Sequence, residues 1–309
     1  GLASGADAVW FVIRYLCTGT WDVRTEGCYL PWYMLQIVLL GRRNLVAVMS
    51  KYIKKRLYGG PGKIGWGYYK GLPKGVSPDD HSFNHKIELI SIADDATVVD
   101  LGCGHGWFAS RLATRFPKAT VYGFDVDPKC IETAIASCSS CNLHFAIFKE
   151  SFVEALPLDC QGHVDAVFVI GVANELSLDR LKSLLCDVHE QLRPHGRVYI
   201  SFIDVVSHHW DGLALAFATY AVPMVQAKGV FLQLCKEAGF SFTAIHDNTP
   251  YSCIPHFRRN RARTWSIFGP CLGACYWLLL SRWLAFVRRG NLHSWNLVLE
   301  KPAFVATRS

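Results

Sequence analysis

The segment Val98–Asp127 constrains the fold of this chain more than any other part of its sequence. An apolar run, Val98-Val-Asp-Leu101, leads into Gly102-Cys-Gly-His-Gly106, and a second apolar run, Thr120-Val-Tyr-Gly-Phe-Asp125, follows further on. Between them, residues 107–116 carry apolar side chains at helical spacing. Glycines in such a loop allow a ligand to approach the backbone closely, because a side chain would block it. The segment therefore predicts a strand–loop–helix–strand unit that binds a ligand.

The same alternation continues along the chain. Short apolar runs that predict strands lie at 97–101, 120–125, 142–148, 164–171, 197–203, 241–246 and 294–300. Helical patterns lie between or before them at 83–92, 107–116, 128–137, 178–192 and 230–238. Strands that alternate with helices at this spacing indicate an α/β protein with a doubly wound sheet. We expect a Rossmann-like fold with seven mostly parallel strands.

The glycine spacing distinguishes between two classes of ligand. Dinucleotides require G-x-G-x-x-G, which places a pyrophosphate on the end of the helix. This chain has G-x-G-x-G, and Asp100 stands two residues before the first glycine. A second acid, Asp125, ends the next strand and can accept two hydrogen bonds from a ribose. S-adenosylmethionine has no phosphate and carries an ammonium group that suits a nearby carboxylate, so the spacing favours this cofactor.

These residues resemble the class I S-adenosylmethionine-dependent methyltransferases. The resemblance rests on Asp100-Leu-Gly-Cys-Gly-His-Gly106, on Tyr122-Gly-Phe-Asp125, and on the turn Leu192-Arg-Pro-His-Gly-Arg197. Within that family the chain is most similar to the branch that methylates small or lipid-like molecules, such as cyclopropane-fatty-acid synthases and sterol or quinone methyltransferases. Gly65-Trp-Gly-Tyr-Tyr69 is a short further similarity to this branch.

The resemblance implies roles for individual residues. It assigns the cofactor to Asp100, Gly102, Cys103, Gly104, Gly106, Asp125, Val126, Glu150 and Asn174. Asp100 would orient the loop and the ammonium group, Asp125 would bind the ribose, and Val126 would flank the adenine. Glu150 is the candidate for the adenine amino group. Asn174 and Glu175 stand where the family commonly has Glu-His, and they could face the transferred methyl group.

Methyl transfer from a sulfonium is an in-line displacement that requires positioning and, for some acceptors, a general base. We expect a base among His208, His209 and Glu175, which follow the fifth and fourth strands. Ligands of such sheets bind at the carboxyl ends of the strands. No metal is expected, because the single CxxC pair, Cys138-Ser-Ser-Cys141, has no second pair at zinc-finger distance.

Two apolar additions flank this core. Residues 1–64 form an apolar and basic extension, predicted to be helical and associated with a membrane or partner, and residues 65–309 form the methyltransferase domain. Packing of the extension on the domain is an equally open interpretation. The domain contains an insertion at about 249–291, in which eighteen uncharged residues, 264–281, are flanked by arginines. Because Gly269-Pro270 and Gly273 would kink this run, we expect a shallow hairpin or an interfacial helix rather than a span. A lid over an apolar pocket is the alternative.

Composition supports the same interpretation. Hydrophobic residues make up 51% of the chain and charged residues 18%, which is apolar for a soluble domain. The net charge of +7 suits an anionic membrane surface, whereas no nucleic-acid-binding motif accompanies the basic runs. Twelve irregularly spaced cysteines indicate a reducing, intracellular compartment. We therefore expect a methyltransferase with an apolar or lipid-like acceptor at a membrane surface. The alternative is a catalytically silent subunit of a membrane-associated complex, which would have protein partners.

Overall fold

A computed structural model describes residues 67–138, 140–205 and 227–303. Its centre is a seven-stranded sheet with the order β3-β2-β1-β4-β5-β7-β6. The strands are β1 (Thr97–Leu101), β2 (Thr120–Asp125), β3 (Leu143–Ile147), β4 (Val164–Ile170), β5 (Leu192–Val205), β6 (Ser241–Asp247) and β7 (Leu292–Glu300). Neighbours pair in parallel except β7, which runs antiparallel to both β5 and β6. The predicted Rossmann-like fold is confirmed.

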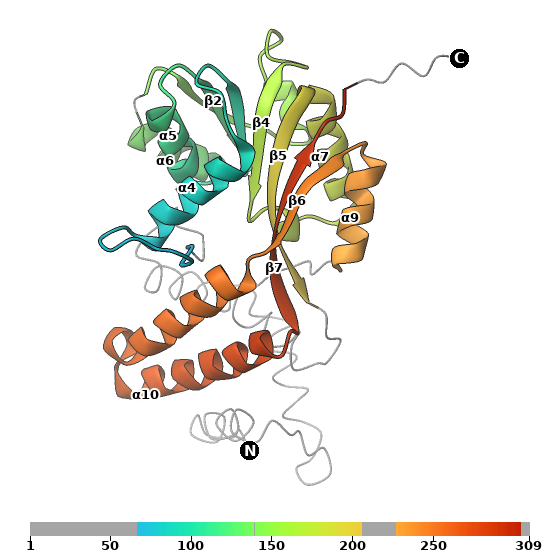
Figure 1. The fold of residues 1–309 in the computed structure, drawn as a ribbon. Helices are drawn as coiled ribbons and strands as arrows, with labels where there is room; N and C mark the ends of the chain where they lie inside the picture. The colour runs from blue at the N-terminus through green and yellow to red at the C-terminus, as the bar shows by residue number, and fades with distance from the viewer. Residues whose placement is uncertain (1–66, 139, 206–226, 304–309) are drawn as a thin grey trace, which may run out of the picture. The chain divides into compact units, whose positions relative to one another are not determined.

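Helices cover both faces of this sheet (Figure 1). They are α4 (Pro78–Ile90), α5 (Trp107–Arg115), α6 (Pro128–Ser137), α7 (Leu178–Gln191) and α9 (Lys228–Glu237). Because side chains alternate along a strand, β1 sends Val98 into the core beneath α4 and α5, and Val99 into the core beneath α7 and α9. This double burial explains why the strands read as continuous apolar runs.

Several boundaries differ from the sequence prediction, most of all the starts of α4 and β5. Helix α4 begins at Pro78 rather than near residue 83, because the Ser77 side chain accepts a hydrogen bond from the Asp80 amide and Pro78 suits the first helical turn. It ends at Ile90, since Ser91 adopts a left-handed conformation with φ 57°. Strand β5 begins at Leu192 rather than at 197, because Leu192 already pairs with Val164 before the register shifts.

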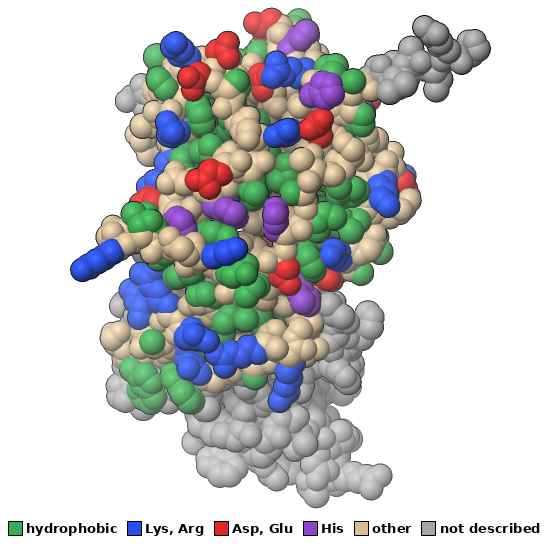
Figure 2. All heavy atoms as spheres, in the orientation of Figure 1, with side chains coloured by type: hydrophobic (Ala, Val, Ile, Leu, Met, Phe, Trp, Pro, Cys, Tyr) green, Lys and Arg blue, Asp and Glu red, His purple; other side chains and the backbone are tan. Residues whose placement is uncertain are grey.

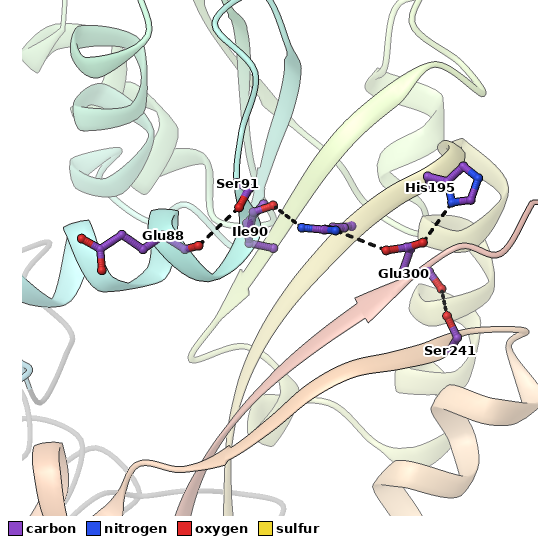
Figure 3. A network of polar contacts seen from close by, with 7 residues as sticks. Glu88, Ile90, Ser91, His195, Ser241 and Glu300 are labelled. Carbon is purple, nitrogen blue, oxygen red and sulfur yellow. Dashed lines mark hydrogen bonds and ion pairs between the residues drawn. The ribbon is translucent and has the colours of Figure 1, made fainter.

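The turn at residues 193–196 is held by polar contacts at the amino end of β5 (Figure 3). His195 Nδ1 lies 3.0 Å from Glu300 Oε1, and Arg197 Nε donates to Glu300 Oε2 at 3.3 Å. Arg197 also donates to the Ile90 carbonyl at the end of α4. The hydrogen bond with His195, together with Arg197, holds the pKa of Glu300 below its usual value, although burial opposes this. These contacts join α4, β5 and β7 at the edge of the sheet opposite the glycine loop. We therefore assign a structural role to the residues at this edge.

The chain divides into two compact units. The sheet and helices above lie in the larger unit, which comprises 61–207, 222–255 and 290–309. The described part of the smaller unit is His256–Arg289, which contains most of helix α10 (Ile254–Arg288). This part lies within the predicted insertion.

Helix α10 folds back on itself (Figure 1). The rings of Phe257 and Trp283 lie 5.6 Å apart between centroids, and Arg261 lies 5.4 Å from the Trp277 ring. A straight helix would separate residues 257 and 283 by about 39 Å, given about 1.5 Å per residue. The reversal lies between them, where the sequence places Gly269-Pro270 and Gly273. The segment is therefore a helical hairpin, and the shallow insertion of this hairpin at a membrane surface stays a prediction.

In the part of the chain that the structure describes, no helix combines the length and the apolar character that a membrane crossing requires. The predicted extension at residues 1–64 lies outside the described residues, and so do His208 and His209.

Candidate active site

The glycine loop lies where β1 ends, between β2 and β4 in the sheet. Gly102, Gly104 and Gly106 all have positive φ, at 72°, 55° and 76°. The amides of Gly102 and Cys103 donate to the Phe124 carbonyl at 2.7 and 3.0 Å, which ties the loop to β2. Helix α5 follows without a side-chain cap, so the amides of its first turn remain available to a ligand.

The three glycines are needed for different reasons. A Cβ at Gly102 would lie 2.1 Å from Val172 Cγ2, and one at Gly106 would lie 2.6 Å from Phe145 Cζ. These two positions are therefore closed by packing. A Cβ at Gly104 would meet no atom within 4 Å. Gly104 consequently faces open space, as the loop position closest to a bound ligand should.

Asp125 braces this loop from the end of β2. Its Oδ2 accepts a hydrogen bond from the Gly104 amide at 2.8 Å, and its Oδ1 accepts one from the Asp127 amide at 2.9 Å. Each carboxylate oxygen can accept a second hydrogen bond. Asp125 thus fits the predicted contact with a ribose, and the adjacent Val126 side chain is 60% exposed, so it is accessible to an adenine.

Asp100 is the most unusual group at the site. Its side chain is 2% exposed, and its Oδ2 has no hydrogen-bond partner among the described residues. Burial raises the pKa of Asp100 to about 7, a hydrogen bond from the Ala109 backbone opposes the rise, and the charge of Asp125 adds to it. A buried acid with one unpartnered oxygen is the expected counterpart of a bound cation. The donor set therefore fits the ammonium group of S-adenosylmethionine.

Cys103 lines the loop as a neutral thiol. Its side chain is buried, and burial, with the nearby charges of Asp100 and Asp125, raises its pKa well above the ordinary value. A thiol that stays protonated is a poor nucleophile, so Cys103 forms part of the wall and not of the chemistry.

The remaining predicted residues lie at the same carboxyl edge of the sheet. Glu150 is exposed and follows β3, in a segment that the Phe148 amide joins to the Asp125 carbonyl at 3.3 Å. Asn174 and Glu175 lie in the short helix η3 (Ala173–Glu175) after β4, and Glu175 is exposed. The roles given to Glu150 and Glu175 stay predictions.

Asn174 has a structural role that the sequence did not indicate. Its Nδ2 donates to the Ile203 carbonyl at 2.9 Å, and its Oδ1 accepts from the Ile203 amide at 2.7 Å. The buried side chain therefore fastens η3 to β5. Contact between Asn174 and the cofactor stays a prediction, and positioning of the β4 loop is the role that its geometry supports.

Sequence reasoning missed a group of aromatic and basic side chains at this edge. Tyr68 stacks on His85 with ring centroids 3.9 Å apart, and His81 lies one helical turn before His85 on α4. The available signal was the i, i+4 spacing of the two histidines, close after Gly65-Trp-Gly-Tyr-Tyr69. Among the described residues, no three His, Cys, Asp or Glu side chains are grouped so that they could hold a metal ion.

Comparisons with known proteins agree with this geometry. Residues 98–196 match a family model described as "Methyltransferase domain". A methionine S-methyltransferase of Zea mays is 37% identical over 67 residues, which cover 20% of this chain and 6% of that protein. A malonyl-[acyl-carrier protein] O-methyltransferase of Hahella chejuensis is 32% identical over 104 residues, covering 34% and 35%. The chain thus matches about a third or less of the length of these relatives.

Solved structures share the whole fold at low sequence identity. A cyclopropane synthase of Mycobacterium tuberculosis superposes with a TM-score of 0.59 at 13% identity, covering 76% of this chain and 89% of the other. Geranyl diphosphate C-methyltransferase of Streptomyces coelicolor superposes with a TM-score of 0.58 at 14% identity, covering 84% and 99%. That second structure contains S-adenosyl-L-homocysteine.

The glycine loop, the two acids and the sheet order define the class of this domain. Residues 98–196 match a methyltransferase domain, the sheet has the order of a Rossmann-like fold, and the residues of the loop fit S-adenosylmethionine. By this match and by its fold, the chain is similar to methyltransferases over residues 98–196.

Proposed function

We propose that this chain transfers a methyl group from S-adenosylmethionine to a small apolar or lipid-like acceptor. The observation that carries the proposal is the pair of acids beside the glycine loop. Asp100 offers a buried, unpartnered oxygen to a cation, and Asp125 braces the Gly104 amide while keeping capacity for a ribose. S-adenosylmethionine supplies an activated methyl group on sulfur when bound. The chain's own residues bind the cofactor and hold the acceptor in line with it.

The nature of the acceptor is proposed from the apolar composition of the chain and from the structural relatives. These relatives include a methyltransferase in complex with geranyl diphosphate, a mycolic acid cyclopropane synthase, and a methyltransferase in complex with phosphomonomethylethanolamine. The compounds in these names are lipids, lipid precursors or small headgroups. Hydrophobic residues make up 51% of this chain, which fits an acceptor that itself has a large apolar part.

We also propose that the enzyme works at an intracellular membrane surface. Helix α10 exposes Arg258, Arg259 and Arg263 together with Trp265, which is 49% exposed, and Trp277, which is 36% exposed. Basic side chains gather over α10 in Figure 2. Arginine and tryptophan on one helix are typical of a helix that lies in the interface of an anionic bilayer. The irregular cysteine pattern supports an intracellular location.

Two measurements test the enzymatic proposal. Calorimetry should detect S-adenosylmethionine binding to the full chain, and Asp125→Ala should weaken it about tenfold or more, since a charge-assisted hydrogen bond contributes roughly 1.5–3 kcal/mol. Incubation with isotope-labelled cofactor and a total lipid extract should then yield a labelled product that mass spectrometry identifies. Cofactor binding without any labelled product would favour the catalytically silent subunit, and no binding by a folded sample would refute the proposal.

The membrane proposal has its own measurement. The full chain should float with vesicles that contain phosphatidylserine and should stay in solution with vesicles of phosphatidylcholine alone. Flotation that is equal for both lipids, or absent for both, would contradict an electrostatic interfacial helix.

A further inference from the structure

A second polar cluster lies on the larger unit, apart from the glycine loop. Tyr68 stacks on His85 at 3.9 Å with an interplanar angle of 7°, and its ring centroid lies 5.4 Å from that of His81. The Tyr69 amide donates to the Tyr251 carbonyl at 2.8 Å, which fixes this segment to the turn after β6. We call the following residues the His–Tyr cluster: Tyr68, Lys70, His81, His85, Lys86, Tyr199, His246 and Tyr251.

The side chains whose charge acts on His85, at the centre of this cluster, are two lysines and two histidines. Burial lowers the pKa of His85 to about 4, and the further contributions come from Lys86, His246, His81 and Lys70. Two nearby acids act on other members of the cluster, Asp79 on Lys86 and Glu88 on Tyr68, and neither contributes to the pKa of His85. His85 therefore sits neutral in a positive environment, where its ring can donate one hydrogen bond. Histidine side chains also gather on the face that Figure 2 shows.

Lys86 is the strongest sign that an anion belongs here. Its ammonium group hydrogen-bonds to the carbonyl and the hydroxyl of Ser82 and lies 6.0 Å from the centroid of the Tyr199 ring. Burial lowers its pKa to about 8, opposed by Asp79. Yet no carboxylate in the described part of the chain forms an ion pair with it. A part-buried cation without an anionic partner is unfavourable, and a bound anion would relieve that cost.

The cluster lies at the edge of the sheet where ligands bind. Strand β6 runs in the same direction as β1, because both β5 and β6 are antiparallel to β7. The turn after β6, η4 (Thr249–Cys253), is therefore at the carboxyl edge, as is the glycine loop. Helix α4 bridges the two places. One face packs Phe83 against Trp107 and Phe108, which follow Gly106, and another carries His81 and His85.

We propose that the His–Tyr cluster binds a phosphate-type oxyanion carried by the methyl acceptor. Lys70 and Lys86 supply positive charge, and the phenol and imidazole groups supply hydrogen-bond donors. This inference rests on the proposed function and narrows its acceptor to an amphipathic molecule with an anionic end. The anion can belong to a soluble phosphate monoester or to a phospholipid headgroup, because both present the same oxygens.

The test measures binding of inorganic phosphate and hexyl phosphate to the full chain by calorimetry, with hexanol as the uncharged probe. Hexyl phosphate should bind at least tenfold more tightly than hexanol. Lys86→Met should weaken hexyl phosphate binding about tenfold or more, and the exposed-site variants Lys70→Gln and His246→Gln about threefold each. Lys118→Gln, which removes one positive charge from an exposed position before β2, should leave the affinity unchanged. If Lys86→Met does not fold, the two exposed-site variants decide the matter.

The outcomes separate this inference from the proposed function. Suppose that the chain binds S-adenosylmethionine but binds hexyl phosphate no better than hexanol. This result would overturn the anion site alone, and so would cluster variants whose affinity for hexyl phosphate equals that of Lys118→Gln. Cluster-dependent phosphate binding in a protein that binds no S-adenosylmethionine would overturn the proposed function and support the anion site. Vesicles of phosphatidic acid distinguish the source, because a headgroup site predicts that they compete with hexyl phosphate and that phosphatidylcholine vesicles do not.

Discussion

Two acids that are 25 positions apart in the sequence, Asp100 and Asp125, lie at the same glycine loop and have opposite properties. Asp125 ends its strand at a half-buried position and accepts two backbone hydrogen bonds, from the amides of Gly104 and Asp127. Asp100 is buried with one oxygen unpartnered, and its environment disfavours the charge. Identical side chains therefore have different roles, Asp125 as a brace for the loop and Asp100 as a counter-ion for a bound cation, because they differ in burial and in hydrogen bonding.

Cofactor affinity should depend on the protonation of Asp100. Because burial raises the pKa of Asp100 to about 7, the free protein retains that proton below pH 7 and must release it to pair with a cation. The affinity for S-adenosylmethionine should fall about tenfold per pH unit between pH 7 and 5.5. The Asp100→Asn variant should bind weakly with a flat profile. Calorimetry in buffers of different ionisation enthalpy checks the proton release, and parallel profiles for the two proteins would contradict it.

Stability without cofactor should change in the opposite direction. A folded-state pKa raised above the usual value means that the folded protein holds more protons between about pH 4 and 7, so stability decreases as the pH rises through that window. Urea unfolding at pH 5 and pH 7 should show this decrease in the wild-type chain and a smaller one in Asp100→Asn. An equal decrease in both would assign the effect to other groups.

The glycine loop offers a matched pair of substitutions. Alanine at Gly104 or Gly106 carries a similar backbone strain of roughly 1–2 kcal/mol, because both have positive φ. At Gly106 the new Cβ would also approach Phe145 to 2.6 Å and Ala134 to 2.9 Å. Gly106→Ala should therefore lose about 2–4 kcal/mol of unfolding free energy. Gly104→Ala should lose about 1 kcal/mol of unfolding free energy. It should nevertheless weaken cofactor binding at least tenfold, because its Cβ would enter the open space that we assign to the ligand. Equal effects on binding and stability would contradict this division.

Among the elements, the ends of β6 and β7 are joined where the insertion leaves the sheet. His293 Nδ1 lies 2.9 Å from Asp247 Oδ2, and the Thr249 amide donates to Asp247 Oδ1 at 2.9 Å. The Ser294 amide donates to the Thr249 hydroxyl at 2.8 Å. These bonds close the base of the insertion, so β6 and β7 can pair although residues 248–291 separate them.

This junction should weaken in acid. Burial opposes ionisation of Asp247, but hydrogen bonds from Thr249 and His293 outweigh it and hold the pKa of Asp247 below the usual value. A lowered folded-state pKa stabilises the protein above the ordinary value near 3.8, and this stabilisation is lost as the pH falls through the lowered pKa. Asp247→Asn should cost about 1 kcal/mol at pH 6 and less at pH 3, measured by urea unfolding. A cost that is the same at both pH values would argue against the carboxylate.

For the whole molecule, the sequence predicted the sheet, its direction and the cofactor loop. These follow from local patterns, since Val98–Leu101 reads as a buried strand and Gly102–Gly106 has a fixed spacing. It did not predict contacts that join distant segments. The bonds between Asn174 and Ile203, and the stacking of Tyr68 on His85, depend on how the chain folds back across the sheet. The start of helix α4 is an intermediate case. Ser77-Pro78 is a local signal for this start, but apolar periodicity alone does not reveal it.

Cofactor binding and membrane binding should be separable in the full chain, because their residues lie in different units. Arg258→Glu with Arg259→Glu should reduce flotation with phosphatidylserine vesicles about tenfold, since each basic residue near an anionic surface contributes about 1 kcal/mol. The same double variant should bind S-adenosylmethionine with unchanged affinity. Asp125→Ala should do the reverse, losing cofactor and keeping vesicle binding, and Lys118→Gln should affect neither. Raising the salt concentration should mimic the arginine substitutions, because screening weakens attraction at an exposed surface. Loss of cofactor affinity in the folded arginine variant would show that the two activities are coupled.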